Sequence, residues 1–212
     1  MGLLDSLINS AKNSVESSLN SAVRKSVNNA KNKATSAIQK SITTKTRTFT
    51  FETLPGGVDE LKALKEADMK DPFGVAALSV LALNALSVNR EKGIEMLEFL
   101  NGPADVCQRD KQFINDRFME GKDYVVRSYF KGSVPENNYT PDKPYTIIVE
   151  EQAHSKDTIN EGYMKLFLHS GGADSERYVV LRTKPSTGEW FLWEYAGMLA
   201  SIKVPVEKDA WA

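Results

Sequence analysis

Two histidines are the side chains of this sequence best suited to bind a metal ion. His154 lies in a polar stretch, and His169 stands just before a pair of glycines. A zinc site needs three or four ligands at recognisable spacing. The sequence contains no HExxH, CxxC or paired-histidine spacing. We therefore expect surface or structural histidines, no metal site and no cofactor.

Cys107 follows Gly102 and Pro103 close to a predicted helix start, where a thiolate would be stabilised, but we expect a half-buried, inert thiol. A single cysteine excludes an internal disulfide, which agrees with a reducing, cytoplasmic compartment. The run 171–175 (GGADS) resembles a phosphate-binding loop, yet such a loop leads into a helix and the strand-like ERYVVLR follows here. This run is predicted to be a hairpin turn in which Asp174 caps the backbone.

Four glutamates offer a second kind of chemistry, because paired carboxylates act as general acid and base. Nothing in the sequence fixes their separation, so solvated side chains are the default expectation. They keep one alternative function open, a hydrolase in which carboxylates or His169 meet in a pocket against a sheet. The glutamates are Glu150, Glu151, Glu161 and Glu194.

The stretch 176–206 must position any such site. It reads as two strands around the turn PSTG (185–188), followed by a third strand-like run, SIKVPV. Strand side chains alternate between faces, and in this hairpin both faces carry large apolar groups. The rest of the chain is therefore expected to cover the hairpin on both sides. One face would hold Trp190, Leu192 and Glu194, and the other Phe191, Trp193 and Tyr195.

Helical patterns fill the region 58–120. The run from Pro72 to Val88 is apolar nearly all round and opens with Asp71 as N-cap and Pro72 in the first turn, so it is predicted to be a buried central helix. Further helices are expected over 58–67, over 90–100 after the cap Asn89, and over 106–120.

Strand patterns are expected at 46–52, which suits an edge strand, and then at 124–130, 144–151 and 162–170. The sequence therefore predicts an α+β fold in which an antiparallel sheet, over about 124–206, packs on the buried helix. Residues 48–212 are expected to form a single domain behind a separate N-terminal arm, residues 1–47.

The arm is basic, with a net charge of +6 against −7 for the remainder of the chain. Its apolar residues recur every three or four positions, which predicts a long amphipathic helix over 3–42. Fifteen of its first 42 residues are Ser or Asn, which costs about 7 kcal/mol of helix propensity. A partner surface must therefore stabilise it through Leu3, Leu4, Leu7, Ile8, Val15, Leu19, Val23, Val27 and Ile38.

Three surfaces could play this part: a membrane interface, another helix in a partner or a second copy, or the chain's own domain. The first would make the protein peripheral at the inner face of the membrane, and the second would make it a homo-oligomer. Nucleic acid is not an expected partner, because the negative domain would repel phosphates.

Six phrases stand in order over 53–212: LPGGVDELKAL, ADMKDPFGVAAL, RDKQFINDRFMEGKDYVVRSYF, PENNYTPDKPYTI, SGGADSERYVVLR and STGEWFLWEY. Together they resemble a bacterial family catalogued as a domain of unknown function, found largely in anaerobic Gram-positive bacteria. The resemblance implies one compact domain and assigns no catalytic residue, activity or cofactor. We therefore expect a non-catalytic interaction or scaffold protein, in which the arm is the tether and the sheet domain binds a ligand or protein.

Overall fold

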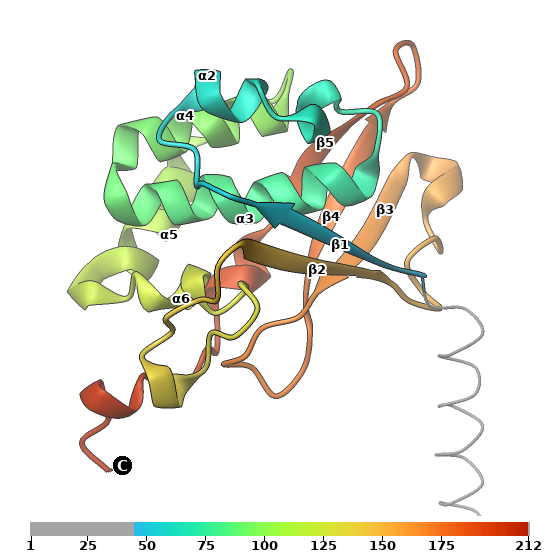
Figure 1. The fold of residues 1–212 in the computed structure, drawn as a ribbon. Coiled ribbons are helices and arrows are strands. Elements are labelled where there is room, and N and C mark those ends of the chain that lie inside the picture. Colours follow the sequence, from blue (N-terminus) through green and yellow to red (C-terminus); the bar gives the residue numbers. More distant parts are fainter. Residues whose placement is uncertain (1–44, 212) are drawn as a thin grey trace, which may run out of the picture. The chain divides into compact units, whose positions relative to one another are not determined.

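Helix α3 (Pro72–Val88) is the centre of the domain in the computed structural model, which describes residues 45–211 (Figure 1). Every residue from Phe73 to Leu86 is buried, as expected for a helix that is apolar all round. The Asp71 side chain accepts a hydrogen bond from the Phe73 backbone N–H, and Pro72 occupies the first turn. The predicted helix, its ends and its cap are confirmed.

The other helices pack beside α3 or follow it along the chain. Helix α4 lies closest, because a Cβ on Gly93 would come within 2.6 Å of the Leu86 nitrogen. Its N-cap is Asn89, whose side chain accepts from the Lys92 backbone N–H, as predicted. The α-helices are α2 (Val58–Lys62), α4 (Arg90–Asn101), α5 (Gln108–Phe118) and α6 (Tyr124–Arg127). The 3-10 helices are η1 (Lys65–Asp68), η2 (Met119–Gly121), η3 (Pro135–Asn137), η4 (Ile159–Glu161), η5 (Ala196–Leu199) and η6 (Val206–Lys208).

Five strands form one antiparallel sheet in the order β1-β2-β3-β4-β5, so every strand pairs with its neighbours in sequence. Helix α3 packs against one face. Along β3 buried side chains alternate with half-buried ones, so the opposite face, called here the outer face, is partly exposed. The strands are β1 (Lys45–Phe51), β2 (Tyr145–Glu151), β3 (Tyr163–Leu168), β4 (Arg177–Lys184) and β5 (Glu189–Glu194).

Three local predictions were wrong. The run 124–130 was expected to be a strand but begins with α6, whose Tyr124, Val125 and Val126 are all buried. The run 201–206 is not a strand either. Ser201 has a positive φ, 55°, and the Lys203 backbone N–H donates to the loop before β4. The predicted helix 58–67 is divided into α2 and η1 by an extended residue, Leu64.

The α+β class is confirmed, with the antiparallel sheet packed on the buried helix. One continuous core joins α3 to the sheet through Phe49, Ile147, Leu166, Leu181 and Leu192. The predicted amphipathic helix over 3–42 lies outside the described residues. Among residues 45–211, no helix is both long and apolar enough to cross a membrane.

Candidate functional site

The histidines and carboxylates singled out in the sequence do not form a metal centre in the described region. Residues 45–211 contain no group of three or more His, Cys, Asp or Glu side chains placed to hold a metal ion. His154 is exposed, and its Nδ1 lies 2.9 Å from Asp157 Oδ2 in a local turn. The carboxylate of Glu151 accepts from Lys156 Nζ at 2.6 Å.

His169 is an exposed residue at the end of β3, where it lines a hollow of about 270 Å³. The other lining residues come from 129–134, from Ile148 and from Gly171, and none of them is acidic. Glu194 borders a different hollow, beside Asp110. The His169 hollow therefore lacks the carboxylate partner that a hydrolytic site built on this histidine would use.

Two expectations about individual side chains are corrected. Cys107 is exposed rather than half-buried. Asp174 does not cap the turn between β3 and β4; its carboxylate accepts from Lys203 Nζ at 2.6 Å, and this hydrogen bond lowers the pKa of Asp174 and raises that of Lys203. The backbone of the turn is capped instead by Ser170 Oγ, which accepts from the Gly172 N–H.

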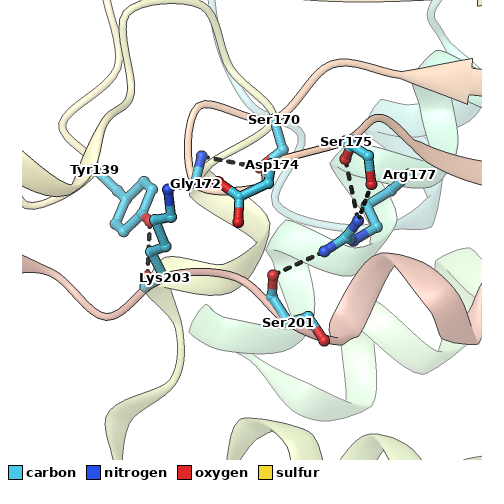
Figure 2. A network of polar contacts seen from close by, with 8 residues as sticks. All are labelled: Tyr139, Ser170, Gly172, Asp174, Ser175, Arg177, Ser201 and Lys203. Carbon is cyan, nitrogen blue, oxygen red and sulfur yellow. Dashed lines mark hydrogen bonds and ion pairs between the residues drawn. The ribbon is translucent and has the colours of Figure 1, made fainter. Parts of the chain in front are cut away.

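Figure 2 shows that this turn belongs to a network that fastens the C-terminal segment to the sheet. The Arg177 guanidinium donates to the carbonyl oxygens of Ala200 and Ser201, at 3.1 and 2.8 Å. The Lys203 backbone N–H donates to the Gly172 carbonyl at 2.8 Å. These hydrogen bonds hold the C-terminal segment in place, so the network has a structural role that requires no ligand.

Tyr139 completes the network from a buried position. Its hydroxyl donates to the Lys203 carbonyl at 2.7 Å, and its ring stacks on Tyr124. Burial raises the pKa of Tyr139 to about 12, so the phenol is neutral at physiological pH. A Cβ on Gly172 would lie 2.1 Å from the same hydroxyl, which explains why this turn needs glycine.

A more open site lies between the end of α4 and the β4–β5 hairpin. It is a cavity of about 390 Å³, called here the hairpin hollow. Most of its wall is apolar, and its polar residues include two cations but no Asp or Glu. The hollow is lined by Asn101, Pro103, Ala104, Arg182, Thr183, Lys184, Pro185, Phe191 and Trp193.

Phe191, which lines the hairpin hollow, lies in close contact with Gly102. The Phe191 ring lies so close to the loop after α4 that a Cβ on Gly102 would come within 2.2 Å of Phe191 Cδ1. Gly102 also has φ +62°, a conformation that suits glycine. Only glycine therefore allows this loop to reach the outer face of β5.

Trp193 borders the hollow and remains 49% exposed. The β4–β5 register shifts at this point, because Val180 pairs with Glu194 while Leu181 pairs with Leu192. Trp193 is thus the extra residue of a β-bulge, a feature that re-aims side chains. The expectation that the rest of the chain covers both faces of the hairpin is not met by residues 45–211, since they leave half of this indole in solvent.

Arg182 holds the exposed indole in place. Its guanidinium lies 4.8 Å from the Trp193 ring centroid and 5.5 Å from that of Tyr163, while the two rings meet edge to face at 5.8 Å. Within the described part of the chain, the Arg182 side chain forms no hydrogen bond or ion pair, although its backbone belongs to the sheet. Its five N–H donors therefore face solvent on a group whose position is fixed by the aromatic rings.

Asn101 supplies the hollow with an unused acceptor. Its Oδ1 is buried and has no hydrogen-bond partner among the described residues. A buried oxygen without a donor costs free energy. The structure therefore leaves a buried oxygen of one lining residue of the hollow unsatisfied.

The lining of the hairpin hollow places apolar surface beside positive charge. The apolar walls can accommodate an apolar side chain, while Arg182 and Lys184 favour a neighbouring anion. The lining residues include no Asp, Glu, His, Cys or Ser. The positive charge of Arg182 and Lys184 is opposite in sign to the net charge of residues 48–212. The preference for an anion is therefore a local property of the hairpin.

Trp193 was expected on a strand, on a face of the hairpin that the rest of the chain covers. Neither the β-bulge nor the close approach of Gly102 to Phe191 produces a local sequence pattern. A charged residue, Arg182, in a strand that also contains β-branched residues is a signal that could have indicated an exposed face. The nine predicted partner-binding residues of the arm, Leu3, Leu4, Leu7, Ile8, Val15, Leu19, Val23, Val27 and Ile38, lie outside the described residues.

Comparisons with known proteins identify a family and no activity. No match was found among curated proteins or among solved structures. A family model described as "Domain of unknown function (DUF6935)" matches residues 53–206, nearly the whole range over which the sequence phrases indicated a resemblance. The chain therefore belongs to the DUF6935 family of domains of unknown function.

Proposed function

We propose that this protein is a non-catalytic interaction protein whose domain binds a polypeptide through the hairpin hollow. One observation carries the proposal: the half-exposed indole of Trp193 is fixed beside an apolar cavity by Arg182, whose N–H donors are unused within residues 45–211. Tryptophan and arginine are the side chains most enriched where protein partners bind tightly. The partner side chain that fits is large and apolar, with a carboxylate nearby.

The arm supplies the second half of the proposal. Its stripe from Leu3 to Ile38 needs an apolar partner surface, and a membrane surface or a partner helix meets that need. The arm would then anchor the chain while the domain binds its partner. The basic charge of the arm favours a peripheral position at the inner face of a membrane, where anionic lipids attract it.

The binding half is tested with the full chain and N-acetyl-L-tryptophan, which joins an indole to a carboxylate. Titration followed by NMR should give saturable shift changes at Phe191 and Trp193, with a dissociation constant on the order of 1 mM for so small a probe. Trp193→Ala should abolish the response. Val88→Ala removes a different exposed apolar side chain and should leave it unchanged. Shifts that are absent, or that survive Trp193→Ala, contradict the proposal.

The tethering half is tested by flotation of the full chain with anionic vesicles of phosphatidylglycerol and phosphatidylcholine. Leu4→Asp with Ile8→Asp places charge on the apolar stripe and should release the protein. The matched variant Ser6→Asp with Ser10→Asp adds the same charge to polar positions. Equal flotation of the two variants, or none for the wild type, would rule out the membrane form and leave the partner helix.

A further inference from the structure

We infer that the occupant of the hairpin hollow is the C-terminal segment of a second copy of this chain, anchored by Trp211. The inference rests on the proposed function, because it names the partner for the same hollow. It starts from the exposed apolar side chains of residues 45–211. Trp211 is 96% exposed, and Val204 and Val206 in the same segment are 44% and 46% exposed.

The chemistry of this segment matches that of the hollow. An indole combines a large apolar body with one N–H donor, and the hollow combines apolar walls with the unpaired Oδ1 of Asn101. Asp209 lies two residues before Trp211, and its Oδ1 accepts from the Trp211 backbone N–H at 2.9 Å. Its carboxylate would therefore reach the docking surface together with the ring.

Charge complementarity fixes the orientation. The hollow presents Arg182 and Lys184 with no acidic neighbour among its lining residues. The C-terminal segment brings Asp209, while its own cation, Lys208, is already bound through Nζ to the Gly121 carbonyl at 2.8 Å. The group left to meet Arg182 is thus an anion, in a bidentate geometry that guanidinium and carboxylate favour.

The two surfaces belong to opposite ends of the domain. In Figure 1 the C-terminal end lies far from the β4–β5 turn, across the whole described part of the chain. The network around Arg177 and Lys203 also fastens the start of the C-terminal segment to the domain. Trp211 therefore docks in the hollow of another molecule, which makes a head-to-tail contact that extends into a ring or a chain of copies.

The test measures association of the full chain by sedimentation velocity from micromolar to millimolar concentration. The wild type should form oligomers that grow with concentration. A hollow variant, Arg182→Glu with Trp193→Ala, and a tail variant, Asp209→Lys with Trp211→Ala, should each weaken this association at least tenfold. Met119→Ala, at another exposed apolar side chain, is the matched control and should associate like the wild type.

Mixing the two variants provides the decisive step. The hollow variant keeps an intact tail and the tail variant keeps an intact hollow, so an equimolar mixture should form a one-to-one dimer that does not grow further. A wild type that does not associate, an association as strong in both variants as in the wild type, or a mixture that associates no more than the separate variants would each overturn the inference. Association through the arm would be the same in all four proteins, so it forms a constant background against which the loss in the two variants is measured. Binding of N-acetyl-L-tryptophan without self-association would leave the proposed function standing and remove only this partner.

Discussion

The guanidinium of Arg182 lies over the indole of Trp193, with 4.8 Å between Cζ and the ring centroid. The contact covers one face of an aromatic ring that the rest of the described chain leaves half exposed. It also holds the guanidinium still, so that a carboxylate meets a donor group whose orientation is already set. The hairpin hollow is therefore an apolar site with a fixed positive edge.

Arg182→Gln should weaken the preference for anionic probes. The wild type is expected to bind N-acetyl-L-tryptophan up to about fivefold more tightly than its uncharged amide, because an exposed charge pair contributes up to about 1 kcal/mol. In the variant the ratio of the two dissociation constants should fall, with Lys184 as the cation that remains in the hollow. Lys165→Gln is the control, because Lys165 lies over Tyr178 on the same face and outside the hollow. A preference that is undiminished in Arg182→Gln would remove Arg182 from the site.

Gly102→Ala should destabilise the domain more than Gly188→Ala. Both glycines have positive φ, at +62° and +67°, so both variants carry a backbone cost of about 1 kcal/mol. A Cβ at 188 meets nothing within 4 Å, whereas one at 102 would overlap the Phe191 ring. The added overlap should cost about 1–3 kcal/mol more, measured as free energy of unfolding in urea. Equal costs would mean that the loop does not press on Phe191.

Tyr139→Phe should change the pH dependence of stability. The folded-state pKa of Tyr139, about 12, lies above the ordinary value of 10.0, so folding favours the neutral phenol. Its contribution is complete below pH 10 and is lost progressively as the pH rises towards 12. The variant has no phenol to ionise and so avoids this loss at high pH, but at pH 7 it lacks a hydrogen bond that contributes about 1 kcal/mol.

Urea unfolding at pH 7 and pH 11 checks this prediction. The variant should be less stable than the wild type at pH 7, and the difference should shrink or reverse at pH 11. Burial also raises the pKa of Tyr129 and Tyr195, but both residues are present in both proteins and cancel in the comparison. A difference that is the same at both pH values would show that Tyr139 does not titrate above its ordinary range.

Asp71→Ala should shorten or fray the start of α3. It removes the hydrogen bond that the side chain accepts from the Phe73 N–H and the ion pair with Arg47, at a cost of about 1–2 kcal/mol. Asp71→Asn retains an N-cap side chain while removing the charge, so it should cost less than half as much. If the two variants are equally destabilised, the ion pair rather than the cap holds this end of the helix.

The parts of the fold with strong local signals could be predicted from the sequence. Helix α3 has a capping residue, a proline in its first turn and a run of seventeen mostly apolar residues. The β4–β5 hairpin has two runs of β-branched and aromatic residues on either side of a turn. The run beginning at Tyr124 was wrongly predicted to be a strand, because β-branched and aromatic residues favour strands while burial beneath the C-terminal segment favours a helix here. There the Tyr129 hydroxyl donates to the Met198 carbonyl, 69 residues away.

The candidate site was less predictable than the fold. Phe191, Trp193 and Arg182 were visible as strand residues, but the hollow depends on a bulge and on a loop that comes from α4. Contacts between segments about 90 residues apart leave no pattern in a single sequence. Conversely, His169 and the glutamates attracted interest by residue type alone, and the structure gives the His169 hollow no acidic residue.

Intermolecular NOEs between N-acetyl-L-tryptophan and the full-length protein test most directly whether the hairpin hollow is the binding site. NOEs are expected from the probe's indole protons to the ring protons of Phe191 and Trp193, and all of them should disappear in Trp193→Ala. NOEs to residues elsewhere on the surface, with none to these two rings, would contradict the assignment of the hairpin hollow as the binding site.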